Sequence, residues 1–206
     1  MRASPKLGRG FTLVELMLVI AIIAILTSII TISLGISRQK SRDSKRIADV
    51  SLIKLALSSY YNDNLFYPKN IYAPSNTTAS SDPANGLAPA YISVVPKDPS
   101  ANTSDNCNST GANGLTSCYH YNAFTTASSG ICNATTNFPV IYHLGTSFED
   151  TTNTALTQDS DAGDRLIPPF STTYYPCTSA PGAFHGNAPN CTGTTAGTDN
   201  CYDLTP

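Results

Sequence analysis

The sequence predicts an α+β protein in which one long N-terminal helix packs on a small antiparallel-sheet head. Three observations support this fold class: residues 11–37 are almost entirely apolar, no proline lies between Pro5 and Pro68, and all six cysteines follow residue 100. The first half of the helix is expected to span a membrane, and the loop-rich C-terminal region to be disulfide-linked. The expected parts are a cleaved cytoplasmic leader (1–10), a transmembrane or filament-core helix (11–37), an amphipathic helix continuation (38–63) and an extracytoplasmic globular head (64–206).

An unusual charge, Glu15, lies near the start of the apolar run. Residues 1–10 carry three bases and no acid, and Glu15 is the only charge in residues 11–36. An ionised carboxylate at the centre of a membrane helix costs roughly 2.5 to 3.5 kcal/mol, so Glu15 is expected to have a partner. A cut between Gly10 and Phe11 would create an ammonium four residues from Glu15, and residues four apart share a helix face at about 5 to 6 Å.

This junction resembles a known family. Gly-Phe-Thr-Leu-Val-Glu at residues 10–15, followed by an apolar run to Leu26, is similar to the prepilin N-terminus of type IV pilins and type II secretion pseudopilins. The resemblance implies cleavage after Gly10, N-methylation of Phe11, and an assembly charge pair between the Phe11 ammonium of one subunit and Glu15 of another. The implied partners are a prepilin peptidase/methyltransferase, copies of the chain and other pilin-like subunits, an inner-membrane assembly platform and membrane lipid.

Beyond the apolar run, the helix is expected to continue to about Asn62, a length of roughly 75 Å at 1.5 Å per residue. Apolar side chains recur there at steps of three and four, which predicts one buried stripe: Ile47, Val50, Ile53, Leu57 and Tyr60. Another face of the helix carries three arginines at a spacing of four: Arg38, Arg42 and Arg46. Lipid phosphates and acids of another subunit are equally favoured as their partners. Asn62, Asp63, Asn64 and Pro68 predict the end of the helix.

The head is expected to hold short strands. Residues 91–95 are β-like and end at Pro96, and residues 91–99 resemble a segment of major pseudopilins and related pilins. Ser100 and Ala101 follow, where many pseudopilins have an aromatic residue and a glycine. Residues 117–124 and 138–144 predict an antiparallel pair of strands.

The cysteines indicate the compartment of the head. An even set in one small domain predicts three disulfides in an oxidising compartment, which places the head outside the cytoplasm and the leader inside. The sequence contains no Cys-x-x-Cys pair, which argues against a zinc site. Fifteen connectivities are open; the favoured one joins near neighbours, as Cys107–Cys118, Cys132–Cys177 and Cys191–Cys201.

Other features limit the chemistry. Asp159, Asp161 and Asp164 form an oxygen-rich loop for which a solvated acidic turn is the favoured interpretation and a calcium site the alternative; the resemblance supports calcium, because secretion-system relatives bind it near the end of the head. The histidines lack metal-ligand spacing, and no catalytic motif occurs, so no enzyme activity is expected. Residues 47–206 hold four bases against twelve acids, which argues against direct nucleic-acid binding.

These observations predict a structural subunit of a type IV pilus-like filament, stored in the cytoplasmic membrane and later part of an extracellular or periplasmic filament. The alternatives are a pseudopilin of a type II secretion system and, in a different class, a membrane- or tip-anchored adhesin or binding module. The sequence does not separate a pilus from a secretion pseudopilus or a major from a minor subunit. It also does not name a ligand, a cargo or a cell envelope type.

Overall fold

The computed structural model describes most of the chain. The described residues are 10–73, 86–101, 107, 118–127, 132, 136–161, 174–177, 191 and 199–206; within the helix, the side chains of residues 29–33 are not described. The chain divides into two compact units, residues 1–39 and residues 40–206.

A single helix, α1 (Leu13–Asn64), accounts for 52 residues. It ends where the sequence predicted: the Asn64 side chain donates to the Tyr60 carbonyl, and the Leu65 amide donates to the Tyr61 carbonyl at a left-handed φ of 64°. Within the described part of the chain, no helix combines the length and the hydropathy needed to cross a bilayer. The span expected at residues 11–37 stays a prediction.

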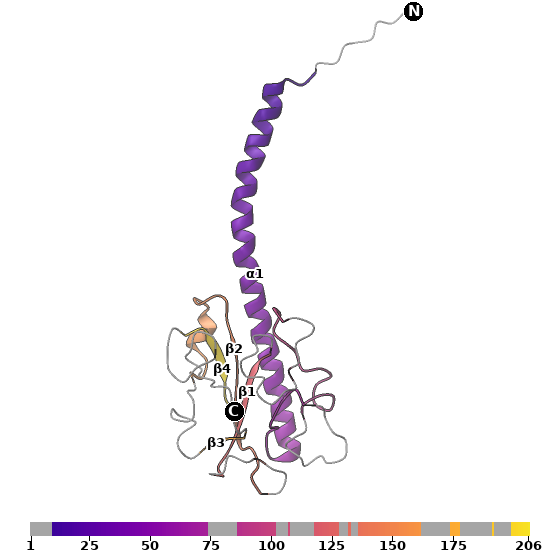
Figure 1. Ribbon diagram of the computed structural model, residues 1–206, viewed down its shortest axis with the longest axis vertical. Helices are drawn as coiled ribbons and strands as arrows, with labels where there is room; N and C mark the ends of the chain where they lie inside the picture. The colour runs from indigo at the N-terminus through magenta and orange to yellow at the C-terminus, as the bar shows by residue number, and fades with distance from the viewer. Residues whose placement is uncertain are drawn as a thin grey trace, which may run out of the picture. The chain divides into compact units, whose positions relative to one another are not determined.

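The described residues of the head include an antiparallel sheet of four strands in the order β3-β1-β2-β4 (Figure 1). The strands are β1 (His120–Thr125), β2 (Ile141–Ser147), β3 (Tyr175–Pro176) and β4 (Cys201–Leu204), and a 3₁₀ turn, η1 (Thr154–Thr157), follows β2. In the central pair, Asn122 lies opposite His143 and Tyr121 opposite Leu144. The two strands predicted from the sequence are confirmed as an antiparallel pair, with bounds a few residues further along the chain.

One hydrophobic core joins the second half of α1 to one face of the sheet. Val50, Ile53 and Leu57 are fully buried, as the predicted stripe requires, and Tyr60 is 1% exposed. Ile47, the first residue of that stripe, is only half-buried. Burial of each aliphatic side chain is worth roughly 1.5 to 3 kcal/mol. From the sheet, alternate residues of the central strands complete this core: Tyr121, Ala123, Tyr142 and Leu144.

The same half of α1 is also fixed to the head by a buried ionic network around Arg46. The Arg46 guanidinium donates Nε and one terminal nitrogen to the two oxygens of Asp98, at 2.6 and 2.9 Å, and its other terminal nitrogen to Asp43 and Glu149, at 2.6 and 3.0 Å. Arg46 is 3% exposed and Asp43 is fully buried. The Asp43 carboxylate also accepts the backbone amides of Glu149 and Asp150. Every donor nitrogen of this buried guanidinium therefore has a partner on α1 or the head.

The network corrects the expected partners of the arginine face. Arg42 donates through Nε to Glu149 at 2.7 Å, so Arg42 and Arg46 both pair with acids of their own chain, partners that were not predicted from the sequence. Burial raises the pKa of Asp98, but hydrogen bonds from Arg46 and Ser100 outweigh it and hold that pKa below its usual range. The Arg42 hydrogen bond lowers the pKa of Glu149. These acids are therefore ionised at neutral pH.

Three disulfides link the head: Cys107–Cys118, Cys132–Cys177 and Cys191–Cys201. This is the near-neighbour connectivity favoured from the sequence. The second bond joins Cys132 to Cys177, which directly follows β3, and the third joins Cys191 to the first residue of β4. Two of the three bonds therefore attach loop cysteines to the edge strands of the sheet.

Two expectations for the head are wrong or incomplete. Residues 91–94 form turns and bends and Val95 has no regular secondary structure, so the predicted strand is wrong. Tyr91 instead packs on Tyr60, with 5.1 Å between ring centroids, and its hydroxyl accepts a hydrogen bond from the Asn64 side chain. The edge strands β3 and β4 were not predicted, because segments of two and four residues are too short to carry a periodic signal.

The opposite face of the sheet carries buried polar groups, and it gives the head a pH dependence. Burial, and then the nearby charge of His143, lower the pKa of His120 to about 4. The folded state therefore favours neutral His120, and its contribution is complete above the unfolded pKa of about 6.5 and lost as pH falls toward 4. We expect stability to fall by up to roughly 3 kcal/mol across this window from His120 alone. Thermal unfolding from pH 7 to 4 should show a shallower decline in H120N; equal slopes in the two proteins would contradict this assignment.

Candidate functional sites

The predicted cleavage junction lies outside the helix. Gly10 and Phe11 have no regular secondary structure, both are exposed, and the Phe11 side chain is 88% exposed. A Cβ built on Gly10 would meet no heavy atom within 4 Å. The peptide bond between these residues is therefore accessible, as a processing site requires.

Glu15 is held by the start of α1. The Thr12 amide and hydroxyl both donate to Glu15 Oε2 at 2.8 Å, and the Glu15 amide donates back to the Thr12 hydroxyl at 3.3 Å. This reciprocal arrangement is a capping box, in which the residue before the helix and the third helical residue satisfy each other's amides. The pattern Thr-x-x-Glu at residues 12–15 is the sequence signal for this capping role, which was not predicted for Glu15 from the sequence. The Phe11–Glu15 charge pair stays a prediction, because the nitrogen of Phe11 is still an amide in the uncleaved chain.

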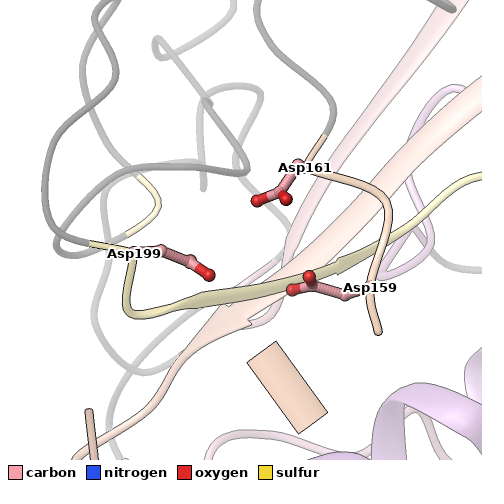
Figure 2. Close-up of side chains that lie close together, drawn as sticks. All are labelled: Asp159, Asp161 and Asp199. Carbon is pink, nitrogen blue, oxygen red and sulfur yellow. The ribbon is translucent and has the colours of Figure 1, made fainter. Parts of the chain in front are cut away.

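A cluster of carboxylates lies in the head beside β4. Asp159, Asp161 and Asp199, here called the aspartate cluster, point toward one another (Figure 2). One carboxylate oxygen from each residue lies within 4.8 Å of the other two. Two of these residues were predicted from the sequence. The third predicted residue, Asp164, lies outside the described residues. Asp199 was missed because it lies 38 residues after Asp161, and only the return of β4 to the sheet brings the two residues close.

The backbone of β4 orients two members of the cluster. The Cys201 amide donates to Asp199 Oδ1 at 3.2 Å, and the Asp203 amide donates to Asp159 Oδ2 at 3.1 Å. Asp203 itself bonds His143 on β2 through a contact of 2.6 Å. The aspartate cluster is therefore built on the sheet edge, although its residues come from loops.

The cluster is electrostatically unfavourable without a cation. Burial, together with the charges of Asp203, Asp199 and Asp161, raises the pKa of Asp159 to about 8. The hydrogen bond from the Asp203 backbone amide lowers this pKa but is outweighed. Burial and the same kind of repulsion raise the pKa of Asp199. Asp159 Oδ1 is buried and accepts no hydrogen bond.

These properties fit calcium. Calcium takes six to eight oxygen ligands at about 2.3 to 2.6 Å, so two oxygens bound to one ion lie at most about 5 Å apart. The spacing of the aspartate cluster meets this limit, and the buried oxygen of Asp159 has an unused lone pair. A divalent cation would also remove the repulsion that raises the two pKa values.

The fold and the N-terminal site together define a class of protein. An exposed Gly-Phe junction precedes a capped helix of 52 residues, whose second half packs on a small disulfide-linked antiparallel head. Residues 6–31 match the family model for the prokaryotic N-terminal methylation motif. These features define a prepilin-type protein.

Comparison with curated proteins narrows this class. Type II secretion system core protein G from Escherichia coli (strain K12) is 38% identical over 106 residues, covering 50% of this chain and 72% of that protein. The protein of the same name from Aeromonas hydrophila is 35% identical over 97 residues, covering 45% and 68%. The one from Pectobacterium carotovorum subsp. carotovorum is 34% identical over 95 residues, covering 44% of this chain and 61% of that protein. The chain belongs to the family of type II secretion system core protein G, the pseudopilins. No solved structure matches it.

Proposed function

We propose that the chain is a structural subunit of a pseudopilus of the type II secretion kind. The observation that carries this proposal is the Gly10–Phe11 junction directly before the capped helix, in a chain related to core protein G. Before assembly the subunit is held in the cytoplasmic membrane with its head outside, and a prepilin peptidase removes residues 1–10 and methylates Phe11. The mature subunit then packs with other pilin-like subunits through α1, and its role is structural rather than catalytic.

Intact-mass and N-terminal analysis of the protein purified from membranes tests the processing step. The expected chain begins at methylated Phe11. A G10V variant, with the same helix and head, should keep its leader and serves as the matched control. A wild-type chain that still begins at Met1 would contradict the proposal and indicate an uncleaved membrane anchor.

A deletion strain tests the assembly step and separates the filament types. Loss of exoprotein release with normal twitching and attachment is the expected result, since the curated relatives are secretion proteins. Loss of twitching with normal exoprotein release would instead assign the chain to a type IV pilus, the first function predicted from its sequence. Normal behaviour in all three assays, with the protein absent from any filament, would favour an anchored binding module.

We further propose that the aspartate cluster holds calcium through Asp159, Asp161 and Asp199. Support comes from the 4.8 Å spacing and the unused oxygen of Asp159. Calcium at 100 times its dissociation constant would stabilise the head by about 2.7 kcal/mol. For a chain of this size we expect a rise in Tm of roughly 5 to 10 °C.

A D159N variant tests whether the stabilisation by calcium depends on Asp159. A carboxyl pKa raised by folding means that stability is lost as pH rises from about 4 to about 8, so D159N should melt higher than wild type at pH 8 without calcium. It should also lose most of the rise with calcium. D150N, which alters an acid bonded to Thr152 rather than a member of the cluster, is the control. Equal calcium responses in D159N and wild type would contradict the site.

A further inference from the structure

One disulfide is joined to the aspartate cluster by the chain itself. Asp199 lies two residues before Cys201, its Oδ1 accepts the Cys201 amide, and Cys201 is bonded to Cys191. Both cysteines are fully buried and form a small cluster of their own, separate from the main hydrophobic core. The position of the Asp199 carboxylate therefore depends on a residue that is fixed from two sides, by the disulfide and by β4.

The strand alone fixes Cys201 only weakly. β4 has four residues, pairs with β2 alone in the described sheet, and begins at Cys201, which lies opposite Ser147 at the last position of β2. One backbone hydrogen bond lies beyond this pair, from the Phe148 amide to the Asn200 carbonyl at 2.8 Å. Terminal pairs of a short edge strand fray most easily. Asp159 has a different support, because its partner amide belongs to Asp203 within the strand. Asp199 precedes the paired residues of β4, so a covalent restraint at Cys201 bears more directly on its position than on that of Asp159.

We propose that the Cys191–Cys201 disulfide is a positioning element of the aspartate cluster, which holds Asp199 in place and thereby raises the affinity for calcium. This inference rests on the proposed calcium site and adds a redox dependence to it. Outer groups that orient metal ligands typically contribute 10- to 100-fold in affinity. Oxidation of this one cysteine pair would therefore couple maturation of the head to calcium binding.

The chain contains a matched control for this proposal. The Cys107–Cys118 disulfide closes a sequence separation of 11 residues against 10 for Cys191–Cys201, so the two restrain the unfolded chain to a similar extent. Cys118 precedes Tyr119, whose amide and hydroxyl bond Tyr72 and Asp49 rather than members of the cluster. Removal of either bond should cost similar stability, but only one should change calcium affinity.

The first experiment measures calcium binding to the full chain in detergent by titration calorimetry. We expect C191S/C201S to bind calcium at least about tenfold more weakly and C107S/C118S to stay within about twofold of wild type. In a D199N background, which is itself weakened, removal of Cys191–Cys201 should have no further effect, because the disulfide acts through Asp199. Wild-type affinity in a folded C191S/C201S variant would overturn the proposal, as would an undiminished tenfold loss in the D199N background.

A second measurement needs no variant and remains valid if C191S/C201S fails to fold. Because binding linkage is reciprocal, calcium must favour the disulfide by the factor by which the disulfide favours calcium. In dithiothreitol redox buffers, with thiols counted by alkylation and peptide mass spectrometry, saturating calcium should shift the Cys191–Cys201 equilibrium at least about tenfold toward the disulfide, or about 30 mV. Cys107–Cys118 should not shift. An equal shift of both bonds, or of neither, would overturn the proposal.

These outcomes are distinguishable from failure of the proposed function. If wild type binds no calcium, the calcium site and its disulfide dependence are both wrong. Processing at Phe11 and exoprotein release would be unaffected by that result, because they depend on the N-terminal site. A redox-dependent affinity in a protein that forms no filament would leave the inference standing and overturn only the assembly role.

Discussion

An E15Q variant will be cleaved and membrane-held like the wild type, yet it will form at least about tenfold fewer filaments. Glutamine retains the helix cap, because its side-chain oxygen can accept from Thr12 as glutamate does in the structure. It removes only the negative charge that the Phe11 ammonium of a neighbouring subunit is expected to meet. Loss of about 1.4 kcal/mol at each subunit contact already changes an association constant tenfold.

The measurement is filament yield after shearing, compared at equal levels of mature subunit. E15A removes both the charge and the cap, so any additional loss in E15A relative to E15Q measures the contribution of the cap. If E15Q assembled normally while E15A failed, the cap rather than the charge would be the function of Glu15. Normal assembly of both variants would exclude both roles.

Replacing Arg46 with methionine will lower the free energy of unfolding of the head by about 3 to 5 kcal/mol. The buried carboxylates of Asp43 and Asp98 would lose their partner, and an uncompensated buried charge costs far more than the original ion pair contributes. For a chain of this length the expected loss in Tm is roughly 10 °C. Urea unfolding of the full chain in detergent checks the prediction.

R42M is the matched control for this variant. Arg42 lies one turn earlier on the same helix and bonds the same Glu149, but its side chain is 35% exposed, so its loss should cost at most about 1 kcal/mol. R46M and R42M with equal stabilities would show that the buried network contributes no more than a surface pair. A large loss in R46M that D98N relieves would identify Asp98 as the charge left uncompensated.

The features predicted correctly from the sequence are those determined by local patterns of residues. The apolar stripe from Val50 to Tyr60 has helical spacing, and its burial follows from that spacing. The end of α1 followed from Asn64 and its neighbours, and the central strand pair from alternation in two short runs. In each case the signal lies within about ten residues of chain.

The features that were missed depend on long-range contacts. Arg46 meets Asp98 across 52 residues and Glu149 across 103, and no local pattern distinguishes these acids from other surface acids. Asp199 joins Asp159 only because β4 returns to pair with β2. The sequence of β4 carries no periodic signal. The position of β4 is determined by its pairing with β2 and by the Cys191–Cys201 disulfide. Even the resemblance at residues 91–99 did not indicate that Asp98 binds the helix.

The capping box at the start of α1 has a consequence for the order of events. Thr12 and Glu15 both follow the Gly10–Phe11 bond, so the groups that begin the helix are all retained when residues 1–10 are removed. Cleavage at this bond would therefore change the charge at this end of the chain and leave the capping contacts between Thr12 and Glu15 in place. Under the proposed function, the helix start of the precursor would thus be retained in the mature subunit, and the new ammonium of Phe11 would be the change that makes a stored subunit competent to assemble.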